Sequence, residues 1–131
     1  MNIAITKPEQ VSVQRTRAIS PDHEVVIVGA GISGLGIAIR LKEQGIESFI
    51  ILERADRVGG TWRDNRYPGI AVDITSFTYS YSFEQNPNWS RVFAPGKELQ
   101  HYTERVAAKY FLYPHIQFKT SVSRAEFDEE R

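Results

Sequence analysis

A glycine-rich turn constrains the fold of this chain more than any other feature. The turn has the form GxGxxG and spans residues 29–34. The short apolar run before it, residues 24–28, predicts a buried strand. After it, apolar residues recur at helical spacing up to Gly45, and residues 48–52 predict a second buried strand. The pattern therefore predicts a strand–helix–strand unit, with four residues facing the sheet from the helix: Leu35, Ala38, Ile39 and Leu41.

Each glycine of this turn has a steric role in a dinucleotide-binding site. Gly29 permits the tight turn out of the strand, Gly31 lets a pyrophosphate approach the backbone, and Gly34 lets helix and strand pack closely. The helix start, which includes Ser33, offers unpaired N–H groups and a partial positive charge to phosphates. The alternative is a Rossmann-like unit that has kept its shape without its ligand.

An acidic residue at the end of the second strand sharpens this prediction. Glu53 follows the glycines by about 20 residues, where a carboxylate can accept hydrogen bonds from ribose hydroxyls. A carboxylate there would repel a 2′-phosphate. The site therefore suits FAD or NAD better than NADP.

Composition excludes several other classes of function. The 131 residues suffice for one domain, and 16 Lys and Arg balance 16 Asp and Glu, so no global field favours nucleic acid or an anionic membrane. The chain has no cysteine, which excludes disulfides and thiolate chemistry, and its three histidines lack metal-ligand spacing, so we expect no metal site. No apolar run is long enough to span a bilayer and the N-terminus lacks a signal core, which leaves a cytoplasmic location as the default.

The rest of the chain predicts one domain with a tail. Residues 1–22 are polar and aperiodic and predict a flexible N-terminal tail, and residues 23–131 form the domain. Asp73 lies in an otherwise apolar segment, where a carboxylate would need hydrogen bonds or a cationic partner. The aromatic-rich residues 76–93 fit either a strand or an extended loop, and such a density of aromatics is more often core than ligand box.

Three further elements complete the predicted α/β fold. Residues 97–110 predict a helix, and residues 116–118 predict a third parallel strand beside the first. Residues 122–127 alternate and predict the opening strand of a small β-meander, whose missing return strand indicates truncation. The fold class is a partial doubly wound, Rossmann-like domain with a parallel sheet.

Residues 24–127 resemble the front part of class B flavin-dependent monooxygenases, which include the Baeyer–Villiger and flavin-containing monooxygenases. The FAD fingerprint up to Glu53 carries the resemblance, together with the Gly-Gly-x-Trp that ends at Trp62. A sharper pattern runs from there through Tyr67-Pro68-Gly69 to Asp73 and is typical of Baeyer–Villiger enzymes. Residues 79–83 also resemble that branch.

The resemblance implies FAD as the cofactor, NADPH as co-substrate, and O₂ and a small molecule as the reactants. It also implies the following roles: Gly29, Gly31 and Gly34 beneath the pyrophosphate, Glu53 and Arg54 at the adenosine ribose, Gly60, Thr61 and Trp62 at the flavin, Tyr79 against the cofactor, the backbone of Val122 at the adenine edge, and Asp73 as a catalytic-site acid that orients the reaction-centre Arg of a complete enzyme.

The chain also departs from this family. It lacks the second glycine motif for NADPH, the linker fingerprint and the catalytic Arg, and Arg63-Asp64 stands where aromatic residues are common. We therefore predict the FAD-binding portion of a monooxygenase that inserts oxygen into a ketone or oxidises sulfur or nitrogen centres, inactive as this chain alone. The alternatives are a non-catalytic FAD-binding module or truncated remnant, and an NAD-dependent dehydrogenase half-domain. The latter does not explain the block that ends at Asp73.

Overall fold

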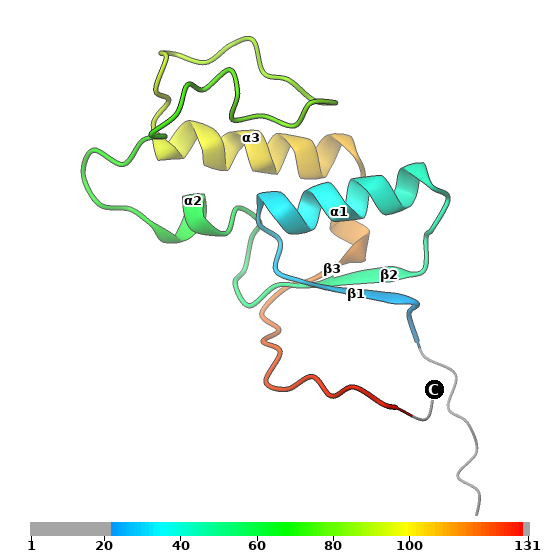
Figure 1. Ribbon diagram of the computed structural model, residues 1–131. Coiled ribbons are helices and arrows are strands. Elements are labelled where there is room, and N and C mark those ends of the chain that lie inside the picture. The colour runs from blue at the N-terminus through cyan, green and yellow to red at the C-terminus, as the bar shows by residue number, and fades with distance from the viewer. Residues whose placement is uncertain (1–21, 130–131) are drawn as a thin grey trace, which may run out of the picture.

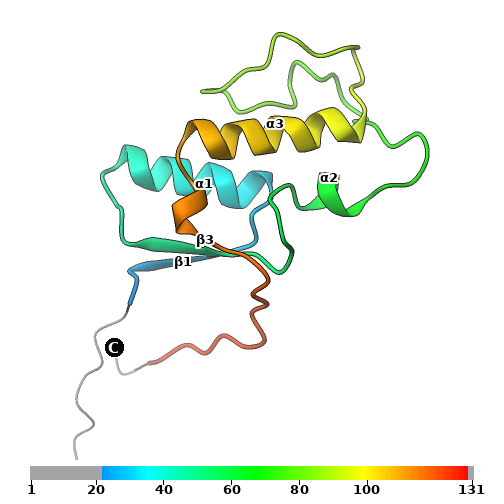
Figure 2. The same cartoon turned by 180° about the vertical axis from the view of Figure 1, so that it is seen from behind.

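Three short parallel strands form the sheet of this protein, whose computed structural model describes residues 22–129. They are β1 (Val25–Val28), β2 (Phe49–Leu52) and β3 (Ile116–Gln117). Helices α1 (Ile32–Glu43) and α3 (Gly96–Lys109) lie side by side on one face of the sheet (Figures 1 and 2). The short helix α2 (Thr61–Asp64) follows β2, and the 3₁₀ turn η1 (Tyr113–His115) leads into β3. The predicted parallel, Rossmann-like α/β fold is confirmed.

The order of the strands differs from the prediction for the third one. The sheet order is β1-β2-β3, so β3 pairs with β2, with Ile51 opposite Ile116, and the prediction that it lies beside β1 is wrong. Right-handed crossovers explain the order. Since α1 and α3 cover the same face, the two successive crossovers must step across the sheet in the same direction (Figure 1).

The core lies between the sheet and the two long helices. Leu35, Ala38 and Ile39 of α1 are buried as predicted, and Leu41 is partly buried. On α3 the buried face follows the predicted helical spacing, with Leu99, Tyr102 and Val106 inside the molecule. This packing fixes the starts of α1 and α3 relative to the end of β2.

The aromatic-rich segment is a loop that folds back over α3 (Figures 1 and 2). The Tyr81 hydroxyl donates to the Ile32 carbonyl, and the Tyr81 N–H donates to the Tyr102 hydroxyl at 2.8 Å. Tyr81, Phe83 and Trp89 pack against the core, whereas Phe77 is exposed. Tyr81 therefore anchors the loop to both α1 and α3.

Residues 118–129 run along the side of the sheet opposite the helices, without forming a strand (Figure 1). The prediction of a meander strand over residues 122–127 is therefore wrong. A strand needs a neighbour to exchange ladder hydrogen bonds, and no segment within residues 22–129 pairs with this one. Its start is fixed, because the N–H groups of Lys119 and Thr120 donate to the carbonyls of Ala55 and Glu53.

The ends of the chain and its helices bear on two further predictions. The predicted tail over residues 1–22 lies, apart from Asp22, outside the described residues. Within residues 22–129, no helix is long and apolar enough to cross a membrane.

Candidate dinucleotide-binding site

Two adjoining hollows lie along the edge of the sheet where β1 and β2 end. The first, here the glycine hollow, has a volume of about 330 Å³ and lies between the glycine turn and the start of α2. The second, here the Arg54 hollow, has a volume of about 410 Å³ and lies between the ends of β1 and β2 and residues 120–122. Val28 and Gly29 line both hollows, so the two form a continuous surface.

Most of the predicted site residues line these two hollows. Arg54 and Val122 line the Arg54 hollow, and Glu53 and Asp73 line neither. The glycine hollow gathers the others: Gly29, Gly31, Ser33, Gly34, Gly60, Thr61, Trp62 and Tyr79. The structure therefore brings together three parts of the sequence that the resemblance linked only by their roles: residues 29–34, residues 60–62 and Tyr79.

The glycine turn is closely packed and leads directly into the first turn of α1. A Cβ on Gly34 would lie 2.0 Å from the Gly29 carbonyl oxygen, so only glycine fits there. Gly31 caps α1 without a side-chain hydrogen bond. The first N–H groups of a helix have no intrahelical partner. Since Ile32, Ser33 and Gly34 at the start of α1 line the glycine hollow, an anion bound there could accept hydrogen bonds from this helix start.

The segment that leads into α2 packs directly against this turn. The Gly59 N–H donates to the Ala30 carbonyl at 3.0 Å. Gly60 has φ +53°, and a Cβ on it would lie 3.0 Å from the Gly31 Cα. At the other side of the hollow, Trp62 and Tyr79 meet edge to face with ring centroids 5.4 Å apart. The hollow thus has a polar backbone wall and an aromatic wall.

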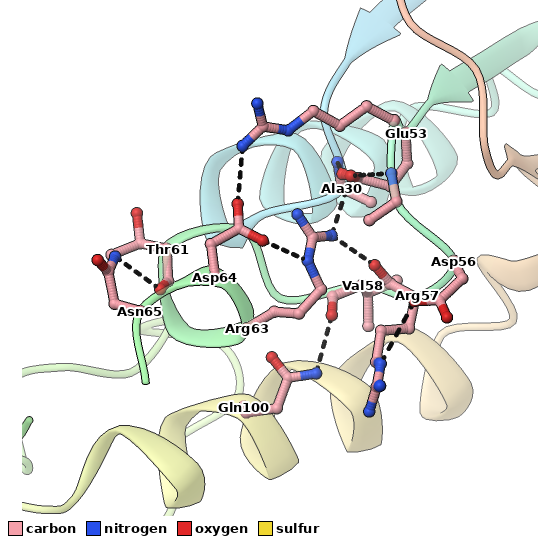
Figure 3. Close-up of polar contacts among 12 residues, drawn as sticks. Ala30, Glu53, Asp56, Arg57, Val58, Thr61, Arg63, Asp64, Asn65 and Gln100 are labelled. Atoms are coloured by element: carbon pink, nitrogen blue, oxygen red, sulfur yellow. Dashed lines mark hydrogen bonds and ion pairs between the residues drawn. The ribbon is translucent and has the colours of Figure 1, made fainter. Parts of the chain in front are cut away.

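Glu53 is buried and its carboxylate faces inward. It is 3% exposed and accepts hydrogen bonds from the Ala30 N–H at 2.7 Å, the Ala55 N–H at 2.9 Å and the Arg63 guanidinium at 2.9 Å (Figure 3). Burial by itself would raise the pKa of Glu53, but the two N–H groups and Arg63 together hold that pKa below its ordinary value. Its contact with a ribose stays a prediction.

Arg63 and Asp64 continue this network and were not assigned a role from the sequence. Arg63 is 5% exposed and also donates to the Arg57 carbonyl at 2.6 Å and to Asp64 at 2.8 Å (Figure 3). The hydrogen bond to Asp64 is the main reason why the pKa of Arg63 is raised. Asp64 also accepts a hydrogen bond from the Arg54 guanidinium at 2.9 Å. The hydrogen bond from Arg63, and after it the one from Arg54, lowers the pKa of Asp64 to about 2. The sequence feature that could have indicated a role for Arg63 and Asp64 is their charge, since they stand at positions where the resemblance leads us to expect aromatic residues.

Gln100 is a second residue that the sequence did not indicate. It is buried on α3, and its amide nitrogen donates to the Val58 carbonyl at 2.9 Å (Figure 3). The same nitrogen donates to the Glu104 carboxylate at 2.7 Å. Gln100 therefore ties α3 to the residue that precedes Gly59. The signal available was weak, because a glutamine on a helix is usually solvated.

Asp73 differs from its predicted setting. Asp73 is exposed. The preceding residue, Val72, is buried, and the Val72 N–H donates to the Ala94 carbonyl at 3.0 Å. The prediction that Asp73 needs a hydrogen-bonding or cationic partner is wrong, since water can solvate an exposed carboxylate. Across residues 22–129, no group of three or more His, Cys, Asp or Glu side chains is arranged to hold a metal ion.

The fold defines a Rossmann-like unit, and both hollows lie at the edge of the sheet where β1 and β2 end. A family model described as "NAD(P)-binding Rossmann-like domain" matches residues 27–95. The chain belongs to this family, and the match covers both the glycine turn and the segment that packs against it.

Curated relatives of this chain are monooxygenases. A Baeyer–Villiger monooxygenase of Streptomyces coelicolor is 48% identical over 107 residues, which are 82% of this chain and 21% of that protein. A Baeyer–Villiger monooxygenase of Pseudomonas aeruginosa is 44% identical over 121 residues, 92% of this chain and 23% of that protein. The chain thus spans about a fifth of the length of these relatives.

Solved structures agree with these relatives. An oxidised steroid monooxygenase bound to NADP has a TM-score of 0.75 and 44% identity, covering 80% of this chain and 21% of that one. The complex of OTEMO with FAD and NADP has a TM-score of 0.78 and 33% identity, covering 86% of this chain and 22% of that one. The chain therefore shares the fold of one part of these monooxygenases.

Proposed function

We propose that this chain is the FAD-binding portion of an NADPH- and O₂-dependent flavoprotein monooxygenase of the Baeyer–Villiger type. One observation carries the proposal: the glycine turn and the start of α2 enclose a single hollow, which continues into a second one along the strand ends. Together the hollows offer backbone N–H donors at the helix start, aromatic rings on one side and a cation on the other. The similarity to FAD- and NADP-bound monooxygenases supports FAD as the dinucleotide.

The residues present fit FAD in a definite orientation. The N–H groups at the start of α1 would hold the pyrophosphate, because Gly31 and Gly60 leave the backbone bare at that point. Thr61, Trp62 and Tyr79 would lie at the flavin, which when bound supplies the redox chemistry. Arg54 and the backbone of Val122 would lie at the adenosine end. The buried Glu53 joins the glycine turn to α2 and would act on the adenosine end by holding these two segments in place.

In this proposal the complete reaction needs more than the residues of this chain. The sequence contains one GxGxxG motif, so we expect the chain by itself to bind FAD without NADPH-dependent turnover. The substrate is a small molecule, either a ketone or a compound with an oxidisable sulfur or nitrogen, and the location is cytoplasmic. The second candidate is a binding module without catalysis, which the same two hollows would serve.

Binding of FAD to the full chain tests the proposal. A carboxylate introduced into the glycine hollow should repel the pyrophosphate, so Thr61→Asp should weaken FAD binding about tenfold or more, on the scale of a charge–charge interaction near a protein surface. The matched control is Asn65→Asp, since Asn65 does not line the glycine hollow and the same charge there should leave FAD binding nearly unchanged. Flavin fluorescence titration measures both. Tighter binding of NADP than of FAD by the unchanged chain would reject the proposal.

Asp73 has a separate test, because we propose that it acts in reaction steps more than in FAD retention. It lines neither hollow. In a complete enzyme that carries this segment, Asp73→Ala should keep most of the bound FAD. It should slow flavin reduction or oxygen transfer by about 10²-fold, the scale of losing one electrostatic stabiliser. Stopped-flow kinetics with FAD occupancy measured alongside gives the answer, and unchanged rates would return Asp73 to a structural role.

A further inference from the structure

The charges at the adenosine end of the site are arranged differently from what the sequence suggests. The sequence assigns the exclusion of a 2′-phosphate to Glu53. In the structure that carboxylate is buried, accepts three hydrogen bonds and is paired with the buried Arg63. A buried and compensated charge exerts little net field on a neighbouring hollow. Another group must therefore set the charge that a ligand meets there.

Arg54 is the charged group that faces this end of the site. Among the residues that the structure describes, it is the only charged one that lines the Arg54 hollow. Its side chain is 72% exposed. An arginine at this point of a Rossmann fold is the residue that accommodates the 2′-phosphate of NADP. Left unpaired, Arg54 would favour a 2′-phosphorylated adenosine, a group that FAD does not carry.

Asp64 prevents Arg54 from being unpaired. One of its oxygens accepts from Arg54 at 2.9 Å and the other from Arg63 at 2.8 Å, so the carboxylate lies between two guanidinium groups. Arg63 is in turn fixed by Glu53 and by the Arg57 carbonyl. The four side chains Glu53, Arg63, Asp64 and Arg54 form a chain of alternating charge that ends at the Arg54 hollow with no net charge.

We infer that Asp64 is a specificity-determining residue of the cofactor site: by pairing with Arg54 it neutralises the cation at the adenosine end and so disfavours adenosine ligands that carry a 2′-phosphate. The inference rests on the proposed FAD site and deepens it. Arg63 is the positioning residue that fixes Asp64 for this role.

A pair of small ligands that differ only in the 2′-phosphate tests the inference. AMP and adenosine 2′,5′-bisphosphate are titrated by calorimetry into the full chain and into Asp64→Asn. The substitution leaves Arg54 unpaired, so affinity for the bisphosphate relative to AMP should rise about threefold to fivefold, the scale of a partly exposed ion pair. Adding Arg54→Gln to Asp64→Asn should return the ratio to its original value.

The matched control is Asp56→Asn, which removes the same charge from a nearby exposed acid that pairs with Arg57 and does not line the Arg54 hollow. It should leave the ratio unchanged. The ratio of the two affinities is measured on one preparation, so partial loss of folding affects both ligands alike. Asp64→Ala repeats the test with a side chain that cannot accept a hydrogen bond from Arg54. An unchanged ratio in both Asp64 variants, or an equal rise in Asp56→Asn, overturns the inference. Failure of the unchanged chain to bind FAD and AMP would instead overturn the FAD site, and this inference with it.

Discussion

The two parts of the site are held together by different kinds of interaction. Residues 25–53 form β1, α1 and β2, and their positions follow from backbone ladders and from apolar packing of buried side chains such as Leu35 and Ile51. Residues 54–95 contain one short helix, the four-residue α2, and no strand of the sheet. They lie against the rest through side-chain hydrogen bonds and a buried ion pair as well as through apolar contacts of side chains such as Val58 and Tyr81. Each part supplies one wall of the glycine hollow.

This difference determines what each part contributes to a ligand. Backbone N–H groups at a helix start are present whatever the side chains are, so the first part provides a phosphate site that depends on a few glycines. The second part has no such ladder, so its geometry depends on individual side chains, among them the buried Arg63. We expect the second part to be more sensitive to a single change of charge.

Removal of the buried cation should have the largest effect. Arg63→Met leaves Glu53 buried with two N–H donors but no counter-charge, which should lower the free energy of unfolding by about 3–5 kcal/mol. Urea unfolding of the full chain measures it. Arg57→Met is the control, because the Arg57 side chain is 54% exposed and pairs only loosely with Asp56 at 3.5 Å, so its effect should stay within about 0.5 kcal/mol. Equal losses in the two variants would show that the ion pair does not hold α2 in place.

Crowding of the glycine turn should come next and tests the first part. In Gly34→Ala the new Cβ meets the Gly29 carbonyl oxygen at 2.0 Å, so backbone must move and the unfolding free energy should fall by about 2–3 kcal/mol. FAD affinity should fall with it. The control is Gly36→Ala in the same helix, where the Cβ meets the Tyr81 ring at 3.0 Å and the better helix propensity offsets the contact to within about 1 kcal/mol. If Gly34→Ala matched this control, the close approach would not be a constraint.

Acid should weaken the second part by a smaller amount. The pKa of Asp64 in the folded protein is about 2, below its ordinary value of 3.8. Above pH 3.8 the ion pairs of Asp64 therefore stabilise the folded state, and this stabilisation is lost as the pH falls from 3.8 toward 2. The lowered pKa of Glu53 adds to the loss with the same sign. Asp64→Asn should therefore flatten the decline of stability between about pH 5 and about pH 2, without abolishing it. Unfolding curves across this range compare the two proteins, and identical slopes would contradict the role of Asp64 in stability.

Local sequence patterns determined the strand–helix–strand unit almost completely. The apolar run, the GxGxxG turn and the helical spacing of Leu35, Ala38 and Ile39 specify β1, α1 and β2 through interactions between residues close in the chain. The helix over residues 97–110 was predicted for the same reason and is observed as Gly96–Lys109. The resemblance to class B monooxygenases added the segment around Gly60 and Trp62, which now lines the same hollow as the glycine turn.

Only the tertiary structure decided how the remaining polar residues are used. Glu53 was expected to accept hydrogen bonds from a ribose, and the structure shows it buried and paired with Arg63, a counter-charge ten residues later that no local pattern indicates. Asp73 was expected to need a partner and is exposed. The place of β3 beside β2 follows from the handedness of two crossovers and from the face that both helices share. The burial of a side chain, its ion-pair partner and the order of the strands all depend on residues that are distant in the chain. The local spacing of apolar residues does not carry that information.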